Sequence, residues 1–145
     1  MPKWAILAAV GAVMVVAAIA LLKSWPVINV VATGRTPEYP DIQPRQYSAG
    51  RDRVSDAVLR AVSRMPRWTL ISSPSGQGDF RVEAKTMLLR FVDDVTIRIV
   101  EQGGATTVNV RSASRVGRGD FGQNARNIRA FLLELDRQME TGAGS

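Results

Sequence analysis

The stretch that decides the fold is residues 91–114, FVDDVTIRIVEQGGATTVNVRSAS, in which two alternating runs flank a pair of glycines. Side chains of a strand point alternately to its two faces, so residues at every second position share a face. One face is apolar or β-branched in both runs, which predicts an antiparallel hairpin with one buried face. The residues on that face are Val95, Ile97 and Ile99 in the first run, and Thr106, Val108 and Val110 in the second.

The turn of this hairpin sets which side chains face each other. A turn at residues 102–103 would place Asp94 opposite Arg111 as a cross-strand ion pair, and would point Asp93 toward the apolar face near Ser112. A shift by two residues, with the turn on the two glycines, keeps the same faces together. Because neighbouring strand residues point to opposite faces, the two aspartates cannot act together on one substrate atom.

Helical and strand patterns continue on both sides of the hairpin. The last helix is expected to begin after Gly119, with Asp120 as its N-cap and Gln123 completing a capping box. The order α-β-β-β-β-α predicts an α+β domain, an antiparallel four-stranded meander covered on one face by two helices. The expected elements are a helix at Arg51–Met65 and strands at Trp68–Ser72, Phe80–Thr86, Phe91–Val100 and Ala105–Ser114, with a break at residues 74–78.

The N-terminal run from Trp4 to Leu22 contains no charged residue over 19 positions, close to the roughly 20 needed to cross a bilayer. The sequence therefore predicts a single-pass transmembrane helix, with residues 4–22 in the membrane. A cleaved signal peptide is the alternative, because residues 18–20 read Ala-Ile-Ala, although the apolar run continues beyond them. Lys3 and the terminal amine on one side are nearly balanced by Lys23 and Arg35 on the other, so the charges fix the orientation weakly. We expect a bacterial inner-membrane protein whose soluble domain lies on the outer, periplasmic side.

These segments divide the chain into four parts. Residues 1–23 form the anchor, 24–49 a proline-rich linker or strap with a possible short strand at residues 28–32, 50–140 the α+β domain and 141–145 a disordered tail.

Composition excludes several kinds of chemistry. The 145 residues include no cysteine and no histidine, which removes disulfides, thiolate or histidine metal sites, and Ser-His-Asp or Cys-His catalysis. We expect no cofactor and no metal. The net charge of +6 is concentrated locally, since five arginines and one acid lie between Arg111 and Arg129. This basic stretch has a single aromatic residue, Phe121, so nucleic acid is not an expected partner.

The segment 111–124, RSASRVGRGDFGQN, joins the last strand to the last helix. Its glycines and the free amides of the helix start could form a concave anion site walled by two arginines, or could simply permit a tight turn. The candidate binding residues are Asp93, Asp94, Arg111, Ser112, Ser114, Arg115, Arg118, Asp120 and Asn124.

The same residues carry a resemblance to a known family. The sequence resembles the bacterial and plastid proteins of domain of unknown function 1499 over roughly residues 39–139. The matching pieces are Met65-Pro-Arg-Trp68, Glu83-Ala84 with Thr86, the Asp-Asp segment of residues 89–98, and Val110-Arg-Ser-Ala-Ser-Arg-Val-Gly-Arg-Gly-Asp120 running on to Gly122, Asn124 and Arg129. The resemblance implies a fold and a membrane or exported setting, but no activity.

These observations favour a non-catalytic binding module that engages an anionic ligand, a lipid headgroup or an envelope protein through the Arg/Gly-rich loop. One alternative is an accessory structural subunit of a membrane complex, which small residues of the span such as Ala8, Ala9, Gly11 and Ala12 would suit. Another is an enzyme that uses Asp93 or Asp94 with Arg111 on a phosphorylated or lipid substrate.

Overall fold

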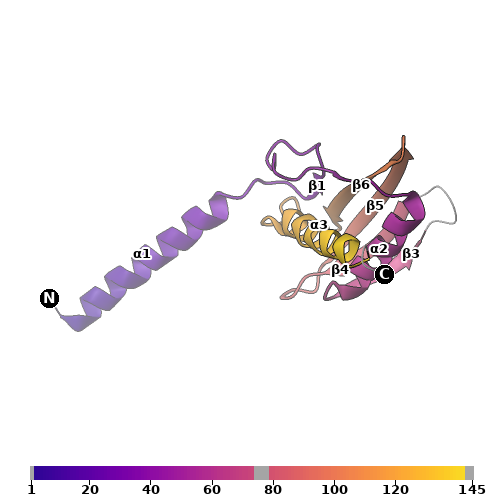
Figure 1. Ribbon diagram of the computed structural model, residues 1–145. Helices are drawn as coiled ribbons and strands as arrows, with labels where there is room; N and C mark the ends of the chain where they lie inside the picture. The colour runs from indigo at the N-terminus through magenta and orange to yellow at the C-terminus, as the bar shows by residue number, and fades with distance from the viewer. Residues whose placement is uncertain (1, 74–78, 143–145) are drawn as a thin grey trace.

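The computed structural model describes residues 2–73 and 79–142 and consists of an N-terminal helix followed by an α+β domain (Figure 1). The expected break at residues 74–78, and residues 143–145 of the expected tail, lie outside the described residues. Residue 141, where that tail was expected to start, is still helical. The elements are α1 (Lys3–Lys23), β1 (Val30–Ala32), β2 (Arg45–Tyr47), α2 (Arg51–Arg64), β3 (Trp68–Ser72), β4 (Asp79–Lys85), β5 (Val92–Gln102), β6 (Ala105–Ser114) and α3 (Gln123–Thr141).

Within the described part of the chain, none of the residues of α1 is buried against the domain. It is long and apolar enough to cross a membrane. An N-terminal helix of this kind could anchor the chain, and a signal sequence has the same features.

The sheet contains the predicted antiparallel meander and extends it by two strands. Its order is β1-β6-β5-β4-β3, and β2 also pairs with β6. Both added strands come from the proline-rich segment 24–49 and occupy successive parts of the free edge of β6: β1 lies beside residues 111–113, and β2 beside residues 106–108. Two apolar side chains of this segment, Val31 and Ile42, are buried in the core.

The hairpin of β5 and β6 turns on Gly103 and Gly104, both with positive φ (61° and 79°). Two successive left-handed residues match the type I′ turn that suits a right-twisted hairpin. The expected pairing of Asp94 with Arg111 across the strands is therefore wrong by two residues, since Asp94 faces Ala113. The shift preserves which side chains share a face, so the apolar faces still coincide.

One face of the sheet carries the core. The helices α2 and α3 lie side by side over it (Figure 1), and β4, β5 and β6 alternate buried and exposed positions beneath them. At the edge of this core the rings of Trp68 and Phe131 stack, with centroids 5.7 Å apart. The domain therefore has the expected arrangement, with both helices on one face of an antiparallel sheet.

The start of α3 differs from the prediction. Phe121 and Gly122 both have positive φ (51° and 75°), so the chain makes one more turn and the N-cap position is Gly122 rather than Asp120. The Asp120 carboxylate still accepts hydrogen bonds from the backbone N–H groups of Gly122 (2.9 Å) and Asn124 (2.7 Å). Asp120 thus caps the helix from a position two residues before the N-cap.

One end of the sheet gathers several connecting segments, and we call it the proximal end. Here Val30 pairs with Ala113 as the chain enters the sheet after α1, and Lys85 pairs with Val92 across the next loop. The proximal end therefore brings together the linker 24–29, the β4–β5 loop 86–91 and the β6–α3 loop 115–122.

Candidate functional site

A buried polar network lies between the sheet and the start of α3. Ser112 donates to Oδ1 of Asn124 (2.6 Å), and Nδ2 of Asn124 donates to Oγ of Ser114 (2.8 Å). Nδ2 of Asn127 donates to Oδ2 of Asp93 (2.9 Å) and lies 3.3 Å from Oγ of Ser112. The expected placement of Asp93 near serines on the inner face is observed, and Asn127, absent from the sequence-based candidates, completes the network.

Burial dominates the chemistry of Asp93, which has 2% of its surface exposed. Desolvation raises the pKa of its carboxyl, and hydrogen bonds from Ser114 and Asn127 partly oppose this rise. Each member of the network is bonded to another member, which is how buried polar groups hold a helix on a sheet. The network therefore locks α3 onto β5 and β6.

Asp94 lies on the opposite, outer face of the sheet from Asp93. Nε of Arg115 donates to one oxygen of Asp94 (3.0 Å) and its NH2 group to the other (2.6 Å), while the same guanidinium pairs with Glu83. The hydrogen bonds from Arg115 hold the pKa of Asp94 below its usual value. The two adjacent aspartates cannot converge on one substrate atom, as the strand alternation predicts.

Two of the amides at the start of α3 are already occupied by a carboxylate of the chain itself. A helix N-terminus can bind an anion through its free N–H groups, but here the Asp120 carboxylate takes two of them. Of the two arginines expected to wall the site, Arg115 is paired on the outer face, and Arg118 is exposed without a side-chain hydrogen bond to any described residue. Arg111 lies elsewhere, in an outer-face groove of about 520 Å³ with Arg35 and Arg98.

The glycine-rich loop instead packs on the linker that follows α1. Nδ2 of Asn29 donates to the carbonyl oxygen of Gly117 (2.8 Å), and the N–H of Asp120 to that of Ile28 (3.1 Å). A β-carbon at Gly122 would lie 2.9 Å from Nε1 of Trp25. The nine candidate residues are therefore distributed among a buried network, a helix cap, an outer ion cluster, a separate groove and one exposed arginine.

A basic groove of about 440 Å³, which sequence reasoning missed, lies near the proximal end between α2, β3, β4 and α3. Apolar groups of Trp68, Ala130 and Leu133 form part of its lining. Its charged lining consists of five basic side chains and a single acid: Arg64, Arg67, Lys85, Arg126, Arg137 and Glu134.

Most of this positive charge is uncompensated. Arg137 pairs with Glu134 at 3.4 Å. Arg126 donates to the carbonyl of Phe121 and to Oε1 of Gln123. Within residues 2–73 and 79–142, the remaining basic side chains and Arg126 make no ion pair with a carboxylate.

The groove could not be recognised from a motif because its basic residues come from three separate elements, α2, β4 and α3, and from the turn between α2 and β3. The only local signal is Arg64-Met-Pro-Arg67, where a proline ends α2 and brings two arginines to one corner. Arg67 adopts a positive φ (62°), and its Nε donates to the carbonyl oxygen of Lys85 (3.3 Å). This contact holds the Arg67 side chain against the backbone at the end of β4.

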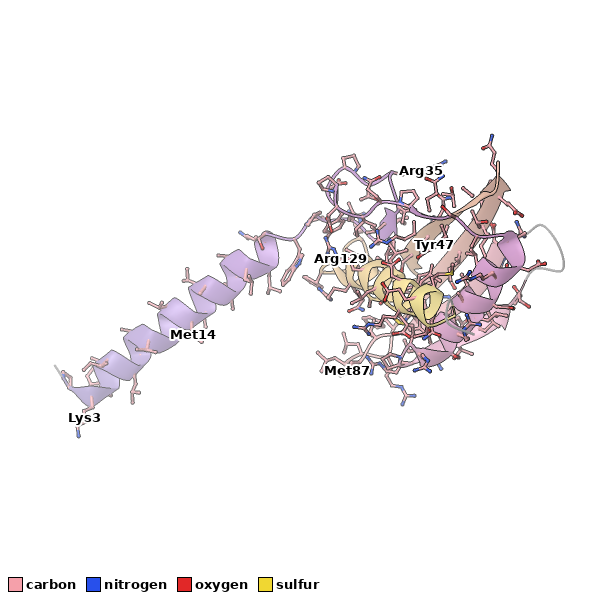
Figure 2. The ribbon with its side chains drawn as sticks, viewed as in Figure 1. Lys3, Met14, Arg35, Tyr47, Met87 and Arg129 are labelled. Carbon is pink, nitrogen blue, oxygen red and sulfur yellow. The ribbon has the colours of Figure 1, made fainter. Side chains whose placement is uncertain are left out.

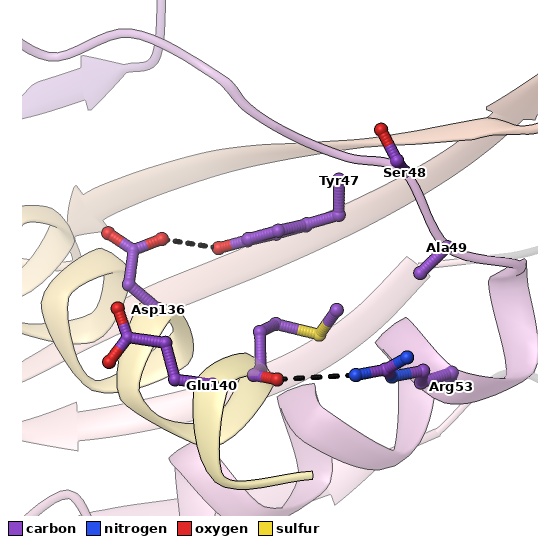
Figure 3. Close-up of a pocket in the computed structure, with 7 residues that line it drawn as sticks. Tyr47, Ser48, Ala49, Arg53, Asp136 and Glu140 are labelled. Atoms are coloured by element: carbon purple, nitrogen blue, oxygen red, sulfur yellow. Dashed lines mark hydrogen bonds between the residues drawn. The ribbon is translucent and has the colours of Figure 1, made fainter. Parts of the chain in front are cut away.

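A third hollow, of about 370 Å³, lies where β2 meets the ends of α2 and α3 (Figure 3). The Tyr47 hydroxyl donates to Oδ1 of Asp136 (2.6 Å), and Nε of Arg45 donates to Oδ2 (3.0 Å). Burial and the hydrogen bond to Asp136 raise the pKa of Tyr47. These polar groups satisfy one another, so this hollow offers a structural contact between β2 and α3.

Metal-binding arrangements are not found among the described residues, since no group of three or more acidic side chains comes together there. The aspartates described above instead accept hydrogen bonds from arginines or from neutral donors.

Comparison with known proteins identifies the family. Residues 19–135 match the model of the family described as protein of unknown function (DUF1499), so the chain belongs to that family. The crystal structure of TTHA0849 from Thermus thermophilus is similar over 80% of this chain and 99% of that chain, with 13% sequence identity and a TM-score of 0.42. None of the curated proteins matches the sequence significantly.

Proposed function

We propose that this member of the DUF1499 family is a membrane-tethered, non-catalytic binding module whose basic groove takes an anionic headgroup. The observation that carries the proposal is the charge of the groove, with five basic side chains against one acid. Arginine and lysine together suit a phosphate-bearing group, because guanidinium groups bind its oxygens in pairs and the ammonium adds a compact charge.

The position of the groove supports a ligand at a membrane surface. Its residues Arg67 and Lys85 lie at the proximal end, the end at which the chain enters the sheet from α1. A headgroup of the bilayer that α1 would cross is therefore within reach. The apolar part of the lining, with Trp68 and Leu133, suits the glycerol and upper acyl region of such a lipid.

The Arg/Gly-rich loop contributes to this groove indirectly. The Asp120 carboxylate occupies the amides of Gly122 and Asn124, but the carbonyl oxygen of Phe121 accepts a hydrogen bond from NH1 of Arg126 (2.9 Å) at the groove wall. The loop thereby positions one of the five cations. This assignment moves the anion site from the loop itself to the groove beside it.

The test measures binding of an anionic headgroup to the full chain in neutral phosphatidylcholine nanodiscs. Isothermal titration uses a soluble short-chain phosphatidylglycerol, and a second arm uses inorganic phosphate to separate a lipid headgroup from free phosphate. We expect the double variant Arg67→Gln with Lys85→Gln to bind the short-chain lipid about tenfold more weakly, equivalent to about 1.4 kcal/mol. Added salt should weaken wild-type binding.

The matched control is Arg35→Gln with Arg111→Gln, which removes two exposed arginines from the outer-face groove. This variant should bind as the wild type does. An equal loss in both variants would indicate unspecific attraction to net charge, and wild-type affinity in the Arg67 and Lys85 variant would refute the groove as the site. Stronger binding of inorganic phosphate than of the lipid would identify a soluble anion as the ligand.

A further inference from the structure

The β4–β5 loop presents a run of large apolar side chains to the surface. Met87 is 73% exposed, Leu88 89% and Leu89 68%, and Phe91 follows at 45%. Single exposed apolar residues are ordinary, but neighbouring ones on a single loop mark an interaction surface. The loop therefore offers an apolar tip to a partner.

The loop is held in a closed shape with these side chains pointing outward. The N–H of Thr86 donates to the carbonyl oxygen of Phe91 (2.8 Å), and the N–H of Phe91 donates to Oγ1 of Thr86 (2.9 Å). Arg90 adopts a positive φ (54°) at the turn. These two bonds close the base of the loop and pair the backbone N–H groups of Thr86 and Phe91 there.

The loop lies at the proximal end, beside the segments that connect the domain to α1. Lys85 and Val92 close it as the last pair of β4 and β5, and the N–H of Arg115, in the β6–α3 loop, donates to the carbonyl oxygen of Val92 (3.2 Å). Figure 2 shows Met87 on the side of the domain that faces α1. The apolar tip and the N-terminal helix are therefore on the same side of the molecule.

The connection between α1 and the sheet is short. Only residues 24–29 separate Lys23, the last residue of α1, from Val30, the first of β1. Six residues reach at most about 20 Å, and Trp25 packs against Gly122 within that distance. A domain tied this closely keeps its proximal end at the bilayer surface, where the effective concentration of lipid is high.

We propose that residues 87–91 insert into the interface of the bilayer that α1 crosses, with Lys85 and Arg90 facing anionic headgroups. Apolar tips with flanking basic residues bind such an interface by burying apolar area and by attraction to its negative charge. The short tether favours the bilayer over a separate protein as the occupant. Insertion would orient the domain with its proximal end, and with it the basic groove, toward the headgroups.

This inference rests on the membrane tether of the proposed function but not on ligand binding in the groove. The chain contains no cysteine, so Leu88→Cys introduces a unique site for a nitrobenzoxadiazole label. The labelled full chain is incorporated into nanodiscs of phosphatidylcholine and phosphatidylglycerol with spin-labelled quencher lipids. Gln102→Cys is the matched control, an exposed position on the same sheet at the opposite end.

We expect a blue-shifted label at position 88, quenched severalfold more by the lipids than the label at position 102. Adding Met87→Asp with Leu89→Asp should abolish that difference while the chain still co-elutes with nanodiscs, and replacing phosphatidylglycerol by neutral lipid should reduce it. Equal quenching at positions 88 and 102 would overturn the proposal, even where the groove binds its ligand. A chain that fails to co-elute with nanodiscs would overturn it as well, by removing the tether.

Discussion

Asp93 is a carboxyl group on the apolar face of the sheet whose hydrogen-bond donors, Ser114 and Asn127, are neutral. The residues described include no cation paired with it. Burial without a counter-charge disfavours the ionised form, which raises the pKa of Asp93. Its neighbour Asp94, bonded to Arg115, has a lowered pKa.

These opposite shifts predict opposite pH dependences for two adjacent aspartates. The folded state holds the Asp93 proton more tightly than the unfolded state, so the contribution of Asp93 to the free energy of unfolding falls as the pH rises from 3.8 through the folded pKa. We expect the stability of the wild type minus that of Asp93→Asn to decrease over this range, as measured by urea denaturation at a series of pH values.

Asp94→Asn supplies the control for this measurement. The stabilising contribution of Asp94 is present above pH 3.8 and is lost as the pH falls through its lowered folded pKa. The free energy of unfolding of the wild type minus that of Asp94→Asn should therefore change only below pH 3.8, and it should increase as the pH rises. A difference for Asp93→Asn that stays constant with pH would contradict the assignment of a buried, unpaired carboxyl.

The environments of Asp93 and Asp94 show how much of a site strand alternation can predict. Asp93 and Asp94 lie on opposite faces, and Asp93 lies near serines, because side chains alternate between the two faces of a strand. A shift of the pairing by two residues does not change which face a side chain occupies. The partner of Asp94 does not, because a two-residue shift replaces Arg111 by Ala113 and leaves the carboxylate to Arg115. The alternation of side chains therefore predicted the environment of Asp93 but not the ion pair of Asp94.

In the β6–α3 loop, a glycine allows the linker to pack closely against the loop. Gly122 combines a positive φ (75°) with close approach to Trp25, whereas Gly104 has a similar φ (79°) and no atom near its missing side chain. The two glycines therefore separate the cost of the left-handed backbone from the cost of a steric clash.

We expect Gly122→Ala to destabilise the protein more than Gly104→Ala does. Gly104→Ala should cost about 1 kcal/mol from backbone conformation, and Gly122→Ala should add a further cost from displacement of the Trp25 ring. Thermal or urea unfolding of the two variants measures the difference. Equal costs would show that the linker does not press on the loop, and adding Trp25→Ala should relieve Gly122→Ala alone.

Element prediction succeeded where the pattern was long. The strands β4, β5 and β6 and both domain helices have clear periodicity, and the observed bounds of these elements and of β3 lie within about three residues of the expected ones. The strands β1 and β2 have three residues each, too few to show alternation among prolines. The basic groove drew its residues from four elements, so no single stretch of sequence could indicate it.

At the scale of the whole molecule, the segment 24–49 completes the fold as well as connecting it to α1. Ile42 is 2% exposed and Val31 is fully buried, and both belong to the single core. The N–H of Gly34 donates to the carbonyl oxygen of Ile42 (2.8 Å), which closes this segment into a compact loop along the free edge of β6.

Truncating Ile42 should therefore destabilise the entire domain. We expect Ile42→Ala to lower the free energy of unfolding by about 2–4 kcal/mol, because it removes buried methyl groups and leaves a cavity. Val30→Ala, at a partly exposed position in the same segment, should cost much less. A near-neutral Ile42→Ala, measured by cooperative urea unfolding, would mean that the segment is a detachable linker.

The pairing of β1 with β6 also decides how the domain responds to mechanical load. A pull on α1 that runs along β1 enters the domain at Val30, the first residue of that strand, which is paired antiparallel with β6. The hydrogen bonds of that pair are then loaded together in shear instead of opening one after another. A load in this direction thus meets the stronger of the two geometries in which a strand can be pulled.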